Sequence, residues 1–537
     1  MSIIQTLLLS AFIALLVTEN YGYGYWMVSR PIFAGPLVGL ILGDVQTGLF
    51  VGATVELMYM GILPIGGSVP PNAQIAGTIS TVFAITSGDP SVGIALALPI
   101  GTLAQLLIML AWNINIYLMH RADKYIEAGD IKGVERTHLA GIPIFFTVFF
   151  VSSFLAIYFG SDFVSNLVNT MPAWLSGGLT VASKMLPAVG MAMLLKMMDF
   201  KNYWCFFLGG FVLVGYLSLN QTAVSLIALV IAVAIYKLGN KNSSSDDEFD
   251  DFEEESPVVE NTAGLLTDKE LKKTFWRSFF SMTSINYERY CSLGFCYAMI
   301  PTIKKLYPNK EDQIAALKRH NEFFNCHPYT GNAVMGVTLA LEEQRALGKD
   351  ISKEAIASTK AALMGPLSGV GDSIFKAVFM TIFAALAAGM ALEGNVIAPF
   401  VFIIPNVALN VASRWLFIKY GHKFGISLVS KMNSNNLLDK FVSAATIVGM
   451  MVTGAMTVGF VSVPLNVIWN ISGKEVNLLT TINSIIPGLL SLVLVLCFYQ
   501  ILNKKKKGMY ICIAICFAIG IVGKNYKFSN MKENEVL

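Results

Sequence analysis

The chain has 537 residues, of which 55% are hydrophobic and 14% are charged. A soluble protein carries about 25% charged residues, so the composition excludes a soluble globular protein and predicts a polytopic membrane protein. The net charge of +3 is close to neutral and gives no reason to expect nucleic acid as a partner.

The first predicted module, residues 1–240, consists of apolar stretches separated by polar connections. Its first stretch, residues 2–17, has no basic n-region and no small-residue cleavage site, so we expect a retained helix and not a signal peptide. The stretches 32–62 and 73–117 each exceed the roughly 20 residues of one span, and Gly and Pro recur inside them, which predicts broken or re-entrant segments. Further apolar stretches cover residues 139–160, 175–198 and 204–236.

The clearest break lies within residues 47–79, where an apolar helical run with one carboxylate, Glu56, gives way to glycines and prolines. Unpaired backbone groups are costly in lipid, so a non-helical segment at membrane depth requires protein or a water-filled cavity to cover it. An ionisable residue beside such a break is a candidate functional site, although residue types alone leave open a surface loop with Glu56 at the membrane interface. The predicted helix-break residues are Gly61, Pro64, Gly66, Gly67, Pro70 and Pro71.

Residues 241–265 differ sharply in composition from the sequence on either side. Eight acidic side chains fall within the ten positions 246–255. Such a block buries no apolar area and repels itself, so we predict a disordered acidic linker between two modules. A solvated tether is favoured over a docking site for a basic partner.

The second predicted module, residues 266–525, opens with sequence of mixed polarity. Leu271, Phe275 and Phe279 recur at i, i+4 and i+8, which predicts amphipathic helices at its start. The parts predicted from here on are amphipathic helices over 266–360, membrane helices over 361–525 and a polar tail over 526–537.

A second apolar stretch interrupted by Gly and Pro, residues 361–379, also holds one acid, Asp372. One lone acid beside a break in each module is the pattern expected of a transporter built from two related halves. We therefore predict an all-α polytopic membrane protein with two modules and broken or re-entrant helices.

The chain lacks the motifs of a self-contained enzyme. No P-loop pattern occurs, so the chain is not itself an ATP-driven pump. Its five histidines and seven cysteines lack metal-ligand spacing, so we predict no catalytic residue, no metal site and no cofactor. Turn-forming residues surround His327, but residue types alone favour a hydrogen-bonded structural histidine over a substrate contact.

Six sequence blocks carry a resemblance to one known family. Within residues 35–79, GPLVGLILGD, VGATVELMYMG and GGSVPPNAQIAGTI resemble the membrane component IIC of the mannose/fructose/sorbose family of the bacterial sugar phosphotransferase system. From Leu266 onward, three blocks resemble component IID of that family: NYERYCSLGFCYAMIPTIKKLYP, KRHNEFFNCHPYTGNAVMGVTLALEEQRA and MGPLSGVGDSIF. The likeness covers about 1–240 and 266–525 and joins two components that are ordinarily separate.

The resemblance implies the sugar-translocating part of a phosphoenolpyruvate-dependent phosphotransferase system. A mannose-type hexose or amino sugar would pass inward for phosphorylation by a separate IIB component, with IIA upstream, so this chain would carry no phosphoryl group. The resemblance further implies a multi-pass protein in the lipid bilayer of the bacterial plasma membrane and a homo-oligomer, with a trimer favoured. The alternatives are an ion-coupled secondary sugar transporter, with Glu56 and Asp372 as proton carriers, and a receptor that keeps the fold without transport.

The resemblance also implies a sugar site with contributions from both modules. Glu56 matches the acid of the family's T-x-E motif, and other positions match the proline pair and the GVGD-S/P motif. Sugar hydroxyls call for carboxylate or amide partners. The predicted substrate-binding residues are Glu56, Asn72, Gln74, His327, Asn332, Asp372 and Ser373.

The second predicted break contains glycines and one departure from the family pattern. Gly365, Gly369 and Gly371 are predicted packing and hinge residues. Asp372 is also suited to cap a helix at the break, and its role as cap or ligand stays open. Lys376 stands where an aromatic residue is common in the family, so the edge of the pocket is expected to differ here.

Overall fold

The described part of the polypeptide is predominantly helical, because a helix satisfies its backbone hydrogen bonds within one segment and so tolerates lipid. The fold class predicted from the sequence, an all-α polytopic membrane protein, is confirmed. The computed structural model describes residues 2–62, 69–170, 172–198, 200–219, 221–240, 265–425, 437–463, 468–471, 474–505 and 508–525.

The first half of the chain forms helices of very different lengths. Its helices are α1 (Ile3–Gly22), α2 (Pro31–Leu42), α3 (Val45–Tyr59), α4 (Ala73–Ser87), α5 (Pro90–Glu127), α6 (Ile131–Leu139), α7 (Gly141–Thr170), α8 (Ala173–Met185), α9 (Pro187–Met197), α10 (Phe200–Gly215) and α11 (Gln221–Asn240). At 38 residues, α5 is about 57 Å long, so it extends past a hydrocarbon core of about 30 Å.

The second half contains helices and one short antiparallel strand pair. Its elements are α12 (Asp268–Ser278), α13 (Ser292–Leu306), α14 (Lys310–His320), α15 (Gly331–Ala346), α16 (Lys353–Gly371), the π-helix η1 (Asp372–Met380), α17 (Thr381–Leu392), α18 (Ala398–Phe424), α20 (Leu437–Phe460), β1 (Ile468–Ile471), β2 (Lys474–Asn477), α21 (Leu478–Ile485), α22 (Leu489–Lys504) and α23 (Gly508–Asn525). The β1–β2 pair was not predicted from the sequence.

Six helices in the described part of the chain are long and apolar enough to cross a membrane. A seventh span results if α21 and α22, which meet at a bend of 86°, are counted together as one broken span. The six are Ile3–Gly22, Pro90–Glu127, Ile131–Gly160, Gly178–Lys196, Lys353–Leu392 and Ala398–Phe424. At the start of the second half, Leu271, Phe275 and Phe279 are all buried, as the amphipathic spacing predicts.

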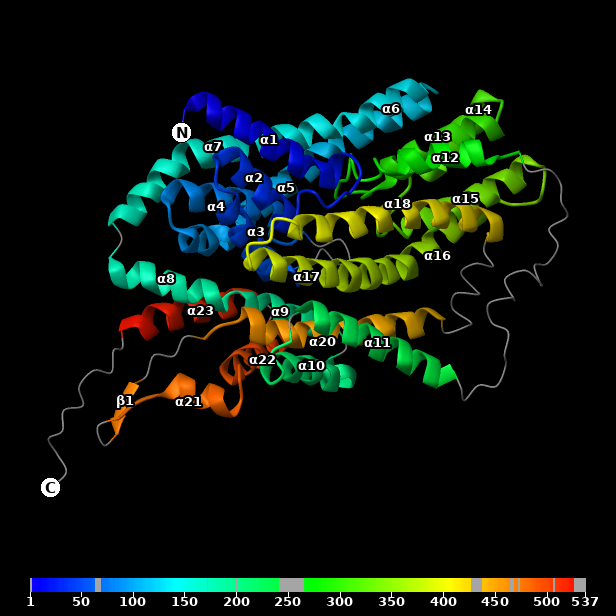
Figure 1. Ribbon diagram of the computed structural model, residues 1–537. Coiled ribbons are helices and arrows are strands. Elements are labelled where there is room, and N and C mark those ends of the chain that lie inside the picture. Colours follow the sequence, from blue (N-terminus) through cyan, green and yellow to red (C-terminus); the bar gives the residue numbers. More distant parts are fainter. Residues whose placement is uncertain are drawn as a thin grey trace.

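The helices lie in two layers, and each half of the chain contributes to both (Figure 1). One layer holds α1–α7 with α12–α18, and the other holds α8–α11 with α20–α23. Within the first layer α17 packs on α3, and within the second α20 packs on α10 and α23 on α8. The sequence modules are therefore not separate bodies in space.

The two predicted helix breaks differ in the structure. Helix α3 ends at Tyr59 and α4 begins at Ala73, so the first predicted break lies between two helices. At the second, α16, η1 and α17 follow one another without a gap, as one helix of 40 residues. Gly365, Gly369 and Gly371 therefore lie inside a helix, and the irregularity is the wider turn of η1, which keeps the backbone hydrogen-bonded.

Several predictions fall outside the described residues. They concern most of the acidic linker, the polar tail and three of the helix-break residues. Those three are Pro64, Gly66 and Gly67.

Candidate functional site

A cavity of about 120 Å³ lies where the two halves of the chain meet. Both halves contribute polar side chains to its wall. These include Arg30, Asn72 and Gln74 from the first half and Asn325, His327, Ser368, Asp372 and Lys376 from the second. The cavity thus brings together four of the seven predicted substrate ligands, two from each half.

The break between α3 and α4 supplies part of the first half's contribution. Asn72 caps α4, because its Oδ1 accepts from the Ile75 N–H at 2.7 Å, and its own N–H donates to the Gly101 carbonyl of α5 at 2.8 Å. A Cβ on Gly101 would lie 2.0 Å from the Tyr59 hydroxyl oxygen, so only glycine permits this approach. Helix α5 thus satisfies the backbone N–H of Asn72, and capping leaves the Asn72 side-chain N–H₂ as the donor for a ligand.

The other break residues that the structure describes lie on either side of this gap. Pro70 and Pro71 line the cavity beside Asn72. Gly61 instead packs against α9, because a Cβ there would lie 2.3 Å from the Met193 Cβ. The break therefore serves both the cavity wall and the contact between the two layers.

Glu56 does not line the cavity but lies behind it. Its side chain is fully buried, and its Oε1 accepts from Arg30 Nε at 3.0 Å and also from Arg30 Nη2. Arg30 in turn lines the cavity. A buried carboxylate needs a charge partner of this kind, so Glu56 fixes the position of a cation that faces the cavity.

His327 lines the cavity. It is 2% exposed, and its Nδ1 accepts from the Tyr329 N–H at 3.2 Å. Burial, together with the charges of Lys376 and Arg414, holds the pKa of His327 well below its usual range, so the ring is neutral. A neutral ring that accepts at Nδ1 carries its proton on Nε2, and this N–H has no protein partner in the part of the chain that the structure describes.

Packing fixes the orientation of this histidine. Its ring stacks on Phe375 of η1, with 5.6 Å between the ring centroids. A Cβ on Gly371 would lie 2.4 Å from the His327 Cβ and 2.5 Å from the Thr330 Oγ1. Gly371 therefore lets the loop that carries His327 lie directly on the helix that carries Asp372.

The two remaining predicted ligands lie away from the cavity wall. The Asn332 side-chain amide donates to the carbonyls of Pro328 and Tyr329 at 2.8 and 3.0 Å, so it holds the His327 loop. Ser373 is exposed, whereas Ser368, one turn earlier, lines the cavity.

One stripe of η1 and the end of α16 faces the cavity at a spacing of four residues. In an α-helix, residues four apart rotate by about 40° at each step, so such a stripe would turn away, but the wider π-helical turn offsets this rotation. Asp372 accepts from Lys376 Nζ at 2.8 Å and has helical dihedrals, φ −64° and ψ −41°, so its side chain does not cap the N-terminus of a helix. The stripe consists of Ser368, Asp372, Lys376 and Met380.

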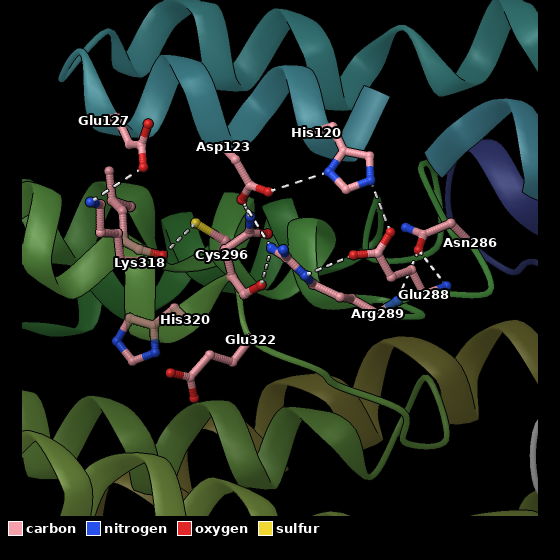
Figure 2. A network of polar contacts seen from close by, with 12 residues as sticks. His120, Asp123, Glu127, Asn286, Glu288, Arg289, Cys296, Lys318, His320 and Glu322 are labelled. Atoms are coloured by element: carbon pink, nitrogen blue, oxygen red, sulfur yellow. Dashed lines mark hydrogen bonds and ion pairs between the residues drawn. The ribbon is translucent and has the colours of Figure 1, made fainter. Parts of the chain in front are cut away.

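A polar network ties α5 to the loop that forms another part of the wall (Figure 2). Arg289 Nη1 donates to Asp123 Oδ1 at 2.9 Å, and Glu288 lies 3.0 Å from His120. Cys291, two residues after Arg289, lines the cavity, and its backbone N–H donates to the Phe324 carbonyl at 2.8 Å. The network therefore positions second-half wall residues on a first-half helix.

Several polar wall residues were not predicted from the sequence, and Arg30 and Ser368 are two of them. Arg30 is the first arginine of the chain and stands just before a proline between two apolar stretches, a setting in which a charge indicates function. Ser368 lies four residues before Asp372, but that signal is visible only once the π-helical turn is known.

Comparison with known families assigns most of the chain. Residues 3–234 match the family described as PTS system sorbose-specific iic component. Residues 265–528 match PTS system mannose/fructose/sorbose family IID component.

Individual relatives cover one half each. The second half is 40% identical over 269 residues to the sorbose-specific EIID component of Klebsiella pneumoniae, covering 49% of this chain and 97% of that protein. The first half is 34% identical over 247 residues to N-acetylgalactosamine permease IIC component 1 of Escherichia coli (strain K12), covering 45% of this chain and 90% of that protein. A chain of the cryo-EM structure of the mannose transporter ManYZ with microcin E492 is 37% identical over 48% of this chain and 97% of that chain, with a TM-score of 0.30.

Proposed function

This chain belongs to the mannose/fructose/sorbose family of the phosphotransferase system and joins its IIC and IID components, the membrane sugar-translocating subunits, in one polypeptide; we propose that its sugar binds in the cavity between the two halves. The observation that carries the proposal is the shared wall, in which polar groups of both halves face one space. A sugar site of this kind requires both components.

The available donors and acceptors suit a polyhydroxyl ligand. His327 Nε2–H and the Asn72 side-chain N–H₂ are donors, and the Gln74 amide supplies both a donor and an acceptor. A buried site that hydrogen-bonds a hydroxyl rejects analogues that lack it, because its own polar groups are then left unpaired. We infer that the ligand is a mannose-type hexose, which a separate IIB component phosphorylates as it is released.

The test follows phosphorylation of a labelled sugar panel in inverted membrane vesicles. The vesicles carry this chain and receive IIA, IIB and the general phosphocarriers, with phosphoenolpyruvate present or omitted. We expect phosphoenolpyruvate-dependent product for one or two hexoses, and a KM raised about 3- to 10-fold in Asn72→Ala, the effect of one lost hydrogen bond. Ser373→Ala is the matched control, because Ser373 is exposed and does not line the cavity.

Two outcomes would contradict the proposal. Equal KM values for Asn72→Ala and Ser373→Ala would remove the cavity as the sugar site. Uptake that ignores phosphoenolpyruvate and collapses with the proton gradient would favour an ion-coupled transporter instead.

We further propose a trimeric assembly in the bacterial plasma membrane, with modules over 1–240 and 266–525 joined by a linker over 241–265. The chain is a multi-pass membrane protein, and the trimer rests on the family resemblance. Native mass spectrometry of the detergent-solubilised protein measures the copy number, and any mass other than three chains would contradict it. Limited proteolysis should cut first within 241–265.

A further inference from the structure

The cavity wall carries a largely buried ion pair. Lys376 Nζ lies 2.8 Å from Asp372 Oδ1, and both side chains are largely buried, with 9% and 14% exposure. Both side chains line the cavity from the same stripe of η1. A ligand in the cavity therefore meets an ammonium group and its carboxylate partner together.

Each charge on this wall has a partner already. The charged side chains among the described lining residues are Arg30, Asp372 and Lys376. Arg30 is paired with Glu56 behind the wall, and Asp372 is paired with Lys376. The wall thus offers a bound sugar no uncommitted carboxylate, while two cations face the same space.

We propose that Lys376 is a specificity-determining residue that makes the cavity select neutral hexoses over sugars carrying a protonated amine. The inference rests on the proposed function, since it assumes that the sugar occupies this cavity. An ammonium substituent would lose its water in a site whose one lining carboxylate is already committed, and it would face two like charges. Like-charge contact and an unpaired buried charge each disfavour binding, whereas a neutral hydroxyl incurs neither penalty.

The ion pair makes the charge preference adjustable in both directions. Removing Lys376 frees Asp372 to pair with an ammonium group, so an amino sugar gains a partner. Removing the charge of Asp372 leaves Lys376 to pair with a carboxylate, so a hexuronate gains one. Removing both charges leaves the stripe without an ionised group, so neither charged sugar gains a partner there.

The experiment measures equilibrium binding to the purified full chain for three sugars that differ at one substituent. The sugars are a hexose, its 2-amino-2-deoxy analogue and its uronate, taken from whichever hexose the vesicle assay identifies, at a pH where the amine is protonated. The variants are Lys376→Met, Lys376→Arg, Asp372→Asn and the double variant Asp372→Asn/Lys376→Met. Lys419→Met is the matched control, because Lys419 is exposed on α18 and does not line the cavity.

We expect the native protein and Lys376→Arg to bind the hexose about tenfold or more tightly than the amino sugar. Lys376→Met should reduce that ratio at least about fivefold, and Asp372→Asn should shift preference toward the uronate by a similar factor. The double variant should favour the hexose again, and Lys419→Met should match the native protein. Hexose binding in each variant reports that it has folded.

The possible failures are distinguishable. If no hexose binds and none is phosphorylated, the proposed function fails. If the hexose binds but the native protein takes the amino sugar equally well, or if Lys376→Met leaves the ratio unchanged, the function stands and the role of Lys376 is refuted.

Discussion

Gly371→Ala tests whether the contact between η1 and the His327 loop sets the affinity for sugar. The new Cβ would lie 2.4 Å from the His327 Cβ, whereas ordinary contact begins at 3.4 Å, so the loop must move by 3.4 − 2.4, or about 1 Å. The neighbour at 2.5 Å is the Thr330 Oγ1, which donates to the Leu367 carbonyl at 2.6 Å and so holds the loop against α16. The loop therefore cannot yield by a side-chain rotation alone.

The expected magnitude follows from this geometry. Overpacking costs about 1–3 kcal/mol, and the better helix propensity of alanine returns about 1 kcal/mol, so stability changes little. A displacement of about 1 Å removes the hydrogen bond from His327 Nε2, which is worth about 0.5–1.5 kcal/mol. We expect a 3- to 10-fold loss of hexose affinity.

The assay is equilibrium binding of a labelled hexose to the purified protein, with phosphoenolpyruvate-dependent phosphorylation in vesicles as the second readout. Gly369→Ala is the matched control on the same helix, because nothing lies within 4 Å of a Cβ placed there. Equal affinities of Gly371→Ala and Gly369→Ala would refute the reasoning.

Three further perturbations test separate contacts. His327→Gln should keep most of the hexose affinity, because the glutamine amide N–H can replace Nε2–H. His327→Ala should lose hexose affinity by about 3- to 10-fold in the same binding assay. An equal loss of affinity in both variants would contradict the assigned tautomer. Glu56→Gln leaves buried Arg30 without a charge partner and should lower the free energy of unfolding by about 3–5 kcal/mol. The measurement is the midpoint of thermal unfolding in detergent, and the double variant Glu56→Leu/Arg30→Met should partly restore that midpoint. Burial would raise the pKa of Glu342, but hydrogen bonds from its neighbours, led by those of Arg319 at 2.6 Å, outweigh burial and hold the pKa well below its usual value. The ionised Glu342 side chain therefore contributes its full share of stability above the unfolded-state pKa of 4.5, and this share is lost as the pH falls below 4.5. The midpoint of thermal unfolding should fall progressively as the pH drops below about 4.5. Glu342→Gln should flatten that slope, while an unchanged slope would remove Glu342 as its cause.

Part of the site could be predicted because the family motifs and the hydrogen-bonding chemistry of sugars point to the same residue types. Asn72, Gln74, His327 and Asp372 share one cavity, and proline or glycine beside polar residues in apolar sequence indicated these regions. Glu56 was singled out for the same reason, but a carboxylate in an apolar stretch looks the same from the sequence whether it faces a ligand or a buried arginine.

The remainder depended on geometry that residue types do not encode. The apolar composition around Gly365–Gly371 is compatible with either a helix or a break, and the glycine and proline residues there led us to predict a break. The structure instead keeps a hydrogen-bonded helix and absorbs the irregularity as a π-helical turn, which determines that Ser368 and not Ser373 faces the cavity. Similarly, the pairing of Arg30 with Glu56 joins residues 26 positions apart, and no local pattern links them.

The sharing of both layers by both halves has a consequence for supply and assembly. Neither half alone completes a layer (Figure 1), so an excess of one half over the other would leave apolar helix faces without their partners. A single polypeptide removes that risk at synthesis, because every ribosome that completes the chain delivers the halves in equal number. It also keeps them at a high effective concentration while they pack. Fusion thus replaces the control of two expression levels with the control of one.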